Sequence, residues 1–491
     1  MDTSSTSPSD FGFNFDNSYL QLPSVFYHQQ KPTFVKNPKL AVFNEAFAQS
    51  LGLNVAALNL NGAAYLSGNE MLNGAQPIAQ AYAGHQFGHF NRLGDGRAIL
   101  LGEHITPQKQ RVDIQLKGAG TTPYSRSGDG RAGLGPMLRE YIISEAMHAL
   151  GVSTTRSLAV TTTGEFIYRN GPSAGAVLTR VAASHLRVGT FQFAAATQNI
   201  QQLKALADYA IQRHFSEVAH DNKPYLALLE QVIQRQAALV AQWMQIGFIH
   251  GVMNTDNVSI CGETIDYGPC AYMNTYHPEA VFSSIDTHGR YAFGNQPTVM
   301  HWNLMRFAET LLPLIDSKET QAIELASECL DAFPKQFFEN WLAGMRKKLG
   351  IFNEEADDLK LVEDLLMYMQ KNQADYTNTF RLLGTDALQA TSLYQDVGFK
   401  NWLVLWQARL TRQKQSVEDS QYLRHRVNPK VIPRNHLVEE ALSAANQGEM
   451  TLFNNLICVL SSPYAEIAHL DKYTQAPDLA FDEQYQTFCG T

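Results

Sequence analysis

The sequence predicts an α+β fold, in which a strand-rich half is followed by a helix-rich half. With 491 residues the chain is too long for one hydrophobic core, so about two to four packed units are expected. Alternating strand patterns and glycine-rich turns gather between residues 83 and 168. Long patterns of helical spacing dominate from residue 225 onward. We therefore expect two lobes, the first built around a sheet and the second around helices.

The first half contains the strand patterns. We expect a disordered segment at residues 1–16, because it is rich in Ser, Thr and Asp, and a helix at residues 40–51 that ends at Gly52. Residues 83–103 predict two strands joined by a turn at Gly94-Asp95-Gly96-Arg97. Residues 111–117 alternate apolar and polar side chains, which predicts a strand with one buried face and Lys117 at the end of its polar face.

Helices follow the strands. Pro136 opens a helix that Gly151 closes, the usual positions for these two residues. Residues 157–168 predict a hairpin that turns at Thr163-Gly164. A long helix over residues 225–248 leads to His250, and the chain is mainly helical from about residue 311.

These patterns divide the chain into four parts. We expect an N-terminal extension at residues 1–60, a first lobe at 61–200, a second lobe at 201–345 and a C-terminal helical region at 346–491. The first lobe would carry the residues that bind phosphate. The second would carry the catalytic loop.

Composition excludes some functions. The chain is 45% hydrophobic and 17% charged, as in ordinary globular proteins. A net charge of −9 argues against nucleic acid as a partner, because a surface that follows phosphates is normally basic. Between Arg92 and Arg187, however, twelve Lys and Arg accompany seven Asp and Glu. A mixed-charge surface and a site for a polyanionic small ligand both explain this excess.

Cysteine use and the N-terminal sequence indicate a cytoplasmic protein. The five cysteines show no C-x-x-C spacing, so neither a zinc ribbon nor a secreted disulfide framework is expected. The first thirty residues contain no Lys or Arg, unlike a signal peptide or an organelle presequence. No run of eighteen apolar residues is present, so no membrane association is expected.

The most informative segment begins at His250 and ends at Asn257, and Asp266-Tyr267-Gly268 follows it. An Asn that closes a polar loop and an Asp before an aromatic residue and a Gly are the two metal ligands of kinase-like folds. Asn257 and Asp266 therefore predict a Mg²⁺ site, although each alone is as well explained as a cap. The usual base Asp is replaced by Val252, so Asp256 becomes the candidate general base.

A second set of residues suits the phosphates of a nucleotide. Lys117 on a strand and Glu140 on the next helix repeat the ion pair that steadies a lysine against phosphates, or are ordinary surface groups. The other candidates lie in glycine-rich turns or flank an apolar segment, where ordinary turns and surface arginines are the alternative: Gly94, Gly96, Arg97, Asp129, Gly130, Arg180 and Arg187.

The order of these motifs resembles the selenoprotein O family, also called YdiU, over nearly the whole chain. The matching segments are Ala83-Gly84-His85-Gln86-Phe87-Gly88, Leu93-Gly94-Asp95-Gly96-Arg97-Ala98, Gln115-Leu116-Lys117-Gly118-Ala119-Gly120, Thr122-Pro123-Tyr124-Ser125-Arg126, Asp129-Gly130-Arg131, the His250 loop, Asp266-Tyr267-Gly268-Pro269, Gly289-Arg290-Tyr291, Trp302-Asn303-Leu304 and Pro433-Arg434-Asn435-His436. Members of this family are kinase-like protein adenylyltransferases.

The resemblance implies a fold, a reaction and a site. The fold would be bilobal and protein-kinase-like, and AMP from ATP would pass to Ser, Thr or Tyr hydroxyls of other proteins or of the enzyme itself. The nucleotide is held flipped in this family, so its α-phosphate meets the hydroxyl. The resemblance assigns Asn257 and Asp266 to Mg²⁺, Asp256 to the general base and Glu140 to the anchoring of Lys117. It assigns ATP to Gly94, Gly96, Arg97, Lys117, Asp129, Gly130, Arg180, Arg187 and Asp266, with Mn²⁺ and UTP as further options.

Two alternative functions remain open from the residues. A small-molecule kinase of the aminoglycoside-phosphotransferase type is favoured by the His250-Gly251 opening of the loop but opposed by Val252. A non-catalytic nucleotide-binding scaffold is the other alternative. The resemblance also places Cys489 where family members carry a selenocysteine or Cys near the C-terminus. A regulatory disulfide to Cys270 and a spare buried thiol are the two interpretations.

Overall fold

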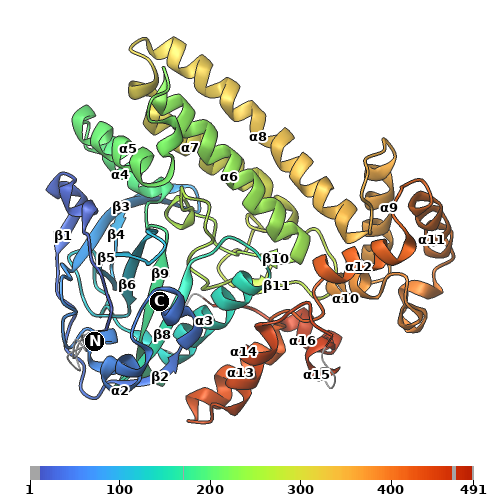
Figure 1. Cartoon of the computed structure of the whole chain (residues 1–491), viewed down its shortest axis with the longest axis horizontal. Helices are drawn as coiled ribbons and strands as arrows, with labels where there is room; N and C mark the ends of the chain where they lie inside the picture. Colours follow the sequence, from blue (N-terminus) through green and yellow to red (C-terminus); the bar gives the residue numbers. More distant parts are fainter. Residues whose placement is uncertain (1–10, 170, 467–470, 489–491) are drawn as a thin grey trace, which may run out of the picture.

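The protein is described by a computed structural model that covers residues 11–169, 171–466 and 471–488. It is a mixed α+β structure with a nine-stranded sheet at one side and long helices leading away from it (Figure 1). The main path of the sheet runs β1-β3-β5-β6-β9-β8-β2, while β4 pairs with β3 and β7 pairs with β9, and these pairings are antiparallel.

The strands occupy the first half of the chain. They are β1 (Tyr27–Gln29), β2 (Lys39–Phe43), β3 (Ile78–Gln86), β4 (His89–Gly94), β5 (Ala98–Ile105), β6 (Arg111–Lys117), β7 (Ala132–Gly133), β8 (Arg156–Tyr168) and β9 (Pro172–Ala182). A separate pair, β10 (Phe248–Ile249) and β11 (Ala271–Tyr272), lies among the helices. The strand predicted at residues 111–117 is confirmed with its exact bounds.

Helices cover both faces of the sheet. On one face α1 (Glu45–Ser50) and α2 (Val55–Leu66) bury a small core that includes Ile114 and Leu116 of β6. On the other lie α3 (Leu134–Ala149), α4 (Val188–Ala196) and α5 (Ile200–His214), within a large core that continues into the second half of the chain. Burial of apolar side chains on both faces is the main force that holds the sheet in place.

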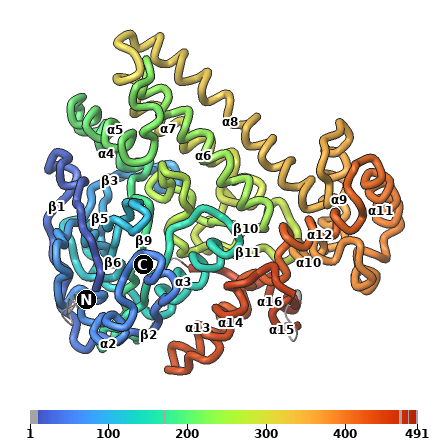
Figure 2. The backbone as a smooth tube through the Cα atoms, in the orientation of Figure 1, coloured from blue at the N-terminus to red at the C-terminus, as the bar shows by residue number. Residues whose placement is uncertain are grey.

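The second half is helical, as expected. Its helices are α6 (Pro224–Ile246), α7 (Gln296–Ile315), α8 (Glu319–Lys348), α9 (Asp358–Lys371), α10 (Tyr376–Leu382), α11 (Val397–Leu410), α12 (Val417–Val427), α13 (Asn435–Asn446), α14 (Thr451–Leu460), α15 (Asp471–Thr474) and α16 (Leu479–Gln484). The tube in Figure 2 shows α6, α7 and α8 side by side, and the end of the chain returning toward α3. In the described ranges no helix is long and apolar enough to cross a bilayer.

Three local predictions are wrong. Of the segment expected to be disordered, residues 1–10 lie outside the described chain, but Phe11 is buried and Asp16 pairs with Arg111 at 2.5 Å. The helix expected at residues 40–51 is instead β2 followed by α1, because β2 adds to the edge of the sheet by pairing with β8, and the Asn44 side chain caps the helix by accepting from Phe47 N–H.

The third error concerns residues 157–168. They do not form a hairpin but one long strand, β8, which turns into β9 instead. Gly164 has a φ of +74° at the point where the register of β8 against β9 shifts. The signal interpreted as a turn is therefore a bulge, which a glycine also permits.

Candidate active site

A cavity of about 500 Å³ lies where the sheet meets the loop after α6. It brings together eight of the residues expected to act there: Gly96, Arg97, Lys117, Arg180, Arg187, Asp256, Asn257 and Asp266. They come from the turn between β4 and β5, from β6, β9, the start of α4, the short 3₁₀ turn Thr255–Asn257 and the loop before β11. Residues up to about 170 positions apart thus meet in one cleft, which periodicity alone does not specify.

The centre of the cleft is the carboxylate of Asp266. Its Oδ1 accepts from Lys117 Nζ and from Arg180 Nη1, each at 2.7 Å, and its Oδ2 accepts from Arg187 Nη1 at 2.8 Å. Burial opposes ionisation, but the three cations outweigh it and hold the pKa of Asp266 well below its usual range. Asp266 also has a φ of +64°, a conformation that is rare outside glycine and clusters at functional sites.

The predicted pair between Lys117 and Glu140 is present. Lys117 Nζ lies 2.6 Å from Glu140 Oε2, and Arg180 Nη1 lies 3.2 Å from Glu140 Oε1. Glu140 is only 3% exposed on the mostly buried helix α3, so its charge needs these partners. A single buried carboxylate thus orients two cations of the cleft.

The loop from His250 to Asn257 is tied to the sheet by hydrogen bonds. Thr255 Oγ1 accepts from His85 N at 2.7 Å, and Asn254 Oδ1 accepts from Phe87 N at 3.0 Å. The buried His250 imidazole contacts Ile265 O at 3.0 Å, just before Asp266. These contacts place the loop against β3 and set the distance between the catalytic candidates and the cations.

Asp256 is a buried carboxylate with an unused acceptor. Its Oδ1 has no hydrogen-bond partner among the described residues, while its backbone oxygen accepts from Arg187 Nη1 at 2.5 Å. Burial raises the pKa of Asp256 to about 6, against opposing effects of Arg187 and of a hydrogen bond from Gln86. A carboxylate with this pKa is ionised at neutral pH and accepts a proton more readily than an exposed one.

The oxygen donors of the cleft fit Mg²⁺. The Asn257 amide nitrogen donates to Val252 O at 2.9 Å, which leaves Oδ1 as the end of the amide without a donor among the described residues. With the Asp266 carboxylate, whose two oxygens accept from Lys117, Arg180 and Arg187, this amide oxygen would form a sparse set of oxygen ligands of the kind that Mg²⁺ prefers, with phosphate and water completing it. Across the described ranges, no group of three or more His, Cys, Asp or Glu side chains is arranged to hold a metal by itself.

Three of the expected residues lie beside the cleft instead of in it. Gly94, Asp129 and Gly130 line an adjoining cavity of about 270 Å³ that shares Gly96 and Arg97 with the main one. The Asp129 carboxylate is occupied by Arg169, at 2.7 and 3.0 Å.

Packing explains the two glycines of the adjoining cavity. Gly130 has a φ of +67° and lies against the backbone of Gly120, while a Cβ on Gly94 would collide with the Tyr124 ring. Both positions therefore need glycine whether or not phosphate binds nearby.

Four residues of the site were not predicted. Tyr82, Asp95 and Arg126 line the cavity, and Gln115 holds Arg180 from behind. The Arg187 guanidinium carbon lies 4.7 Å from the centre of the Tyr82 ring, which is a cation–π contact. Asp95 sits within the predicted glycine turn and Gln115 on the predicted strand, so the signal was present but assigned to backbone geometry.

Of the two cysteines in the disulfide hypothesis, the structure describes only Cys270. Cys489 lies outside the described residues. Cys270 is fully buried next to the cleft, and burial raises the pKa of its thiol to about 12, with Arg139 opposing the shift.

The fold and the cleft together define an α+β protein in which Lys117, Arg180 and Arg187 converge on one carboxylate. A family model described as "Protein adenylyltransferase SelO" matches residues 11–461. Proteins called "Protein nucleotidyltransferase YdiU" are similar throughout: that of Brevibacillus brevis is 59% identical over 482 residues, covering 98% of both chains, and that of Geobacillus kaustophilus is 57% identical over 484, covering 98% of this chain and 100% of the relative. The chain therefore belongs to the protein adenylyltransferase SelO family, and it is a nucleotidyltransferase.

Proposed function

We propose that this chain transfers AMP from ATP to Ser, Thr or Tyr hydroxyls of proteins, including its own, and releases pyrophosphate. The observation that carries the proposal is the convergence of Lys117, Arg180 and Arg187 on one carboxylate next to Asp256. A triphosphate would replace that carboxylate as the partner of the cations. The family name supports the reaction, and the missing base at Val252 argues against ordinary phosphoryl transfer.

The arrangement of elements supports a bilobal, kinase-like division. Residues 61–200 would form the lobe that holds phosphate and residues 201–345 the lobe with the catalytic loop. Residues 1–60 would be an extension and residues 346–491 an added helical region. The ion pair between β6 and α3 is the feature that such a division shares with kinases.

The cations would stabilise the leaving group. When the α-phosphorus bond to the bridging oxygen breaks, negative charge builds on the β- and γ-phosphates, and preorganised cations stabilise that charge most in a buried site. Lys117, Arg180 and Arg187 are each at most 8% exposed, and Arg97 lines the same cavity. Gly94, Gly96, Asp129 and Gly130 would hold the remainder of the nucleotide along the adjoining cavity.

Asp256 would act as the general base. The substrate hydroxyl oxygen forms a bond to the α-phosphorus, the bond to the pyrophosphate oxygen breaks, and the hydroxyl proton passes to the Asp256 carboxylate. Asn257 and Asp266 would hold Mg²⁺ or Mn²⁺, which supplies positive charge to the phosphates when bound. For Asp266 this requires release of its cations, which a bound triphosphate would then occupy.

The position of the label in ATP tests the reaction. Incubation with α-³²P-ATP should mark protein and incubation with γ-³²P-ATP should not. The opposite pattern would reject AMP transfer in favour of a kinase. Repeating the α-label with UTP asks whether UMP is also transferred.

A matched variant separates an enzyme from a nucleotide-binding scaffold. Asp256→Asn should lower transfer by about 10² to 10⁴-fold and keep ATP affinity, because a base acts in the transition state. If Asp256→Asn labels protein at the wild-type rate, Asp256 is not the base. If wild type labels nothing with either isotope, the scaffold is the better description.

A further inference from the structure

Three alternate residues of β6 share one face of the strand, and all three are buried. Asp113 is 2% exposed, Gln115 0% and Lys117 8%. The intervening Ile114 and Leu116 are buried on the opposite face under α1 and α2. The polar face of β6 is therefore not solvated, and each of its side chains requires a partner in the interior.

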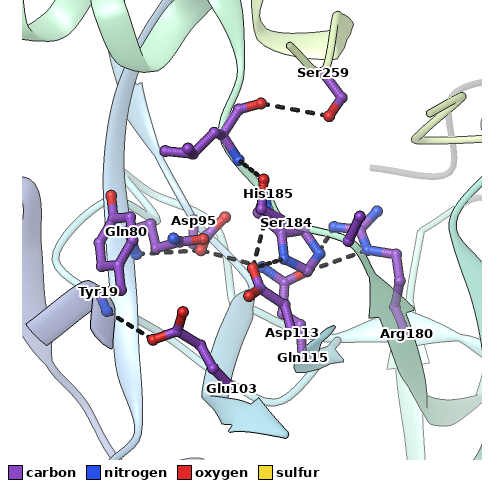
Figure 3. A network of polar contacts seen from close by, with 12 residues as sticks. Tyr19, Gln80, Asp95, Glu103, Asp113, Gln115, Arg180, Ser184, His185 and Ser259 are labelled. Atoms are coloured by element: carbon purple, nitrogen blue, oxygen red, sulfur yellow. Dashed lines mark hydrogen bonds and ion pairs between the residues drawn. The ribbon is translucent and has the colours of Figure 1, made fainter. Parts of the chain in front are cut away.

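Gln115 holds Arg180. Its Oε1 accepts from Arg180 Nη2 at 2.6 Å and from Nε at 3.2 Å, while its Nε2 donates to Asp95 Oδ2 at 3.3 Å (Figure 3). Because a guanidinium only donates and a carboxylate only accepts, these neighbours determine which end of the Gln115 amide faces each of them. Arg180 Nη1 is thereby left pointing at Asp266 and Glu140.

Asp113 holds the loop that leads to Arg187. Its Oδ2 accepts from His185 N at 2.9 Å and from His185 Nδ1 at 2.8 Å, two residues before Arg187 (Figure 3). Arg213 Nη2 donates to Asp113 Oδ1 at 2.6 Å and to Ala183 O at 2.7 Å. The turn between β9 and α4 is thus clamped from both sides.

We infer that Asp113 and Gln115 are positioning residues, which set Arg180 and Arg187 in register with Lys117 through the buried polar face of β6. The choice of residue types supports this role. A carboxylate at position 115 would neutralise Arg180, whereas an amide orients the guanidinium and leaves its charge for a phosphate. The charge of Asp113 faces Arg213, which it shares with Glu103, and among the described residues it forms no ion pair with the cleft cations.

This inference rests on the proposed nucleotide role of Arg180, and a double-mutant cycle tests the two separately. Calorimetry would measure ATP affinity of wild type, Gln115→Met, Arg180→Ala and the double variant. Gln115→Met should weaken binding about tenfold in the wild-type background but less than about twofold when Arg180 is absent. Leu116→Met, on the opposite face of β6, should leave affinity unchanged.

Three outcomes would contradict the positioning role of Gln115 or its basis. Equal losses in both backgrounds would mean that Gln115 serves only the general fold. No loss in either background would remove the positioning role. Wild-type affinity in Arg180→Ala would instead overturn the nucleotide role of Arg180, and with it the basis of the inference.

The contact between Asp113 and His185 provides a second test if Gln115→Met does not fold. His185→Asn keeps a side-chain donor close to the place of Nδ1, whereas His185→Leu removes it. ATP affinity should fall about tenfold in His185→Leu and at most threefold in His185→Asn, and the difference should vanish when Arg187 is replaced by Ala. Equal affinity of the Leu and Asn variants would overturn the inference for Asp113.

Discussion

Lys117 Nζ lies 2.7 Å from Asp266 Oδ1, so a cation of the sheet and a carboxylate of the loop neutralise each other across the cleft. The same carboxylate also engages Arg180 and Arg187. Without metal, Asp266 therefore competes with any phosphate for all three cations. With metal bound, the carboxylate would become a ligand and the cations would become available.

Asp266→Asn should separate these two states. Removing the competing charge should tighten ATP binding in the presence of EDTA by about tenfold. This is the effect expected when the interaction with the cations changes by the equivalent of one pKa unit, about 1.4 kcal/mol. AMP transfer with Mg²⁺ should be lost. Calorimetry in EDTA and the α-label assay would measure the two effects. Weaker metal-free binding than wild type would show that Asp266 is not a competitor.

Glu140→Gln should reduce activity by more than its effect on the stability of the fold explains. It removes the counter-charge of Lys117 and Arg180 and should lower AMP transfer by about tenfold or more, since misplaced charges stabilise the transition state poorly. Glu145→Gln is the matched control on the same helix, because Glu145 pairs with Arg156 at 2.6 Å away from the cleft. Glu140→Gln should lose about 3 kcal/mol of stability or more, as a broken buried pair does, and Glu145→Gln should lose less, because its pair is only half-buried. Only Glu140→Gln should lose activity. Equal loss of activity would assign Glu140 a structural role alone.

Gly84→Ala should displace the candidate base without touching it chemically. A Cβ at Gly84 would collide with Asp256 Oδ1, so the carboxylate must move. Transfer should fall about tenfold or more while ATP affinity changes little, because a shifted base misaligns attack. Gly62→Ala in α2, where the added methyl meets only the side chains of Leu58 and Leu66, is the control. Unchanged transfer rates in Gly84→Ala would argue that Asp256 is not the base.

The stability of the protein should fall in mild acid because of His214. Burial, and then Arg213, lower the pKa of His214 to about 3, below its unfolded value. A depressed histidine pKa contributes stability that is complete above about pH 6.5 and is lost as the pH falls toward 3. From pH 7 to pH 5 the loss from this group should be about 2 kcal/mol.

Denaturant unfolding at pH 7 and pH 5 would measure this loss. His214→Gln can still accept from the Ser184 hydroxyl, which contacts His214 Nε2 at 2.7 Å in the wild type, so the variant should fold. Its stability should depend less on pH by about the same 2 kcal/mol. His220→Gln, at an exposed position, should keep the wild-type dependence. An identical pH dependence in both variants would contradict the assignment.

Much of the local structure could be predicted from the amino-acid order. The alternation of β6, the Pro136 and Gly151 signals at the ends of α3 and the helical spacing of α6 are local patterns, and each predicted a real element. The errors came where two local signals compete. Gly164 is compatible with a turn and with a bulge, and only the pairing of β8 with β9 distinguishes them.

The candidate site shows the same division. Spacing alone singled out Asp256, Asn257 and Asp266, because their motif is local in the chain. Lys117 and Glu140 could be named but their contact could not be measured, since a strand and a helix specify no distance between their side chains. The roles of Asp95 and Gln115 could not be anticipated, because both depend on a neighbour from another strand.

What the order of residues decided is which face of β6 is apolar and which is polar. Only the tertiary structure decided that the polar face is buried too, since Glu140 of α3, Arg213 of α5 and the loop that carries Asp266 contact it. Alternation reports a difference between two faces and not the exposure of either one. Because that face is buried, Asp113, Gln115 and Lys117 contact side chains of the interior instead of solvent.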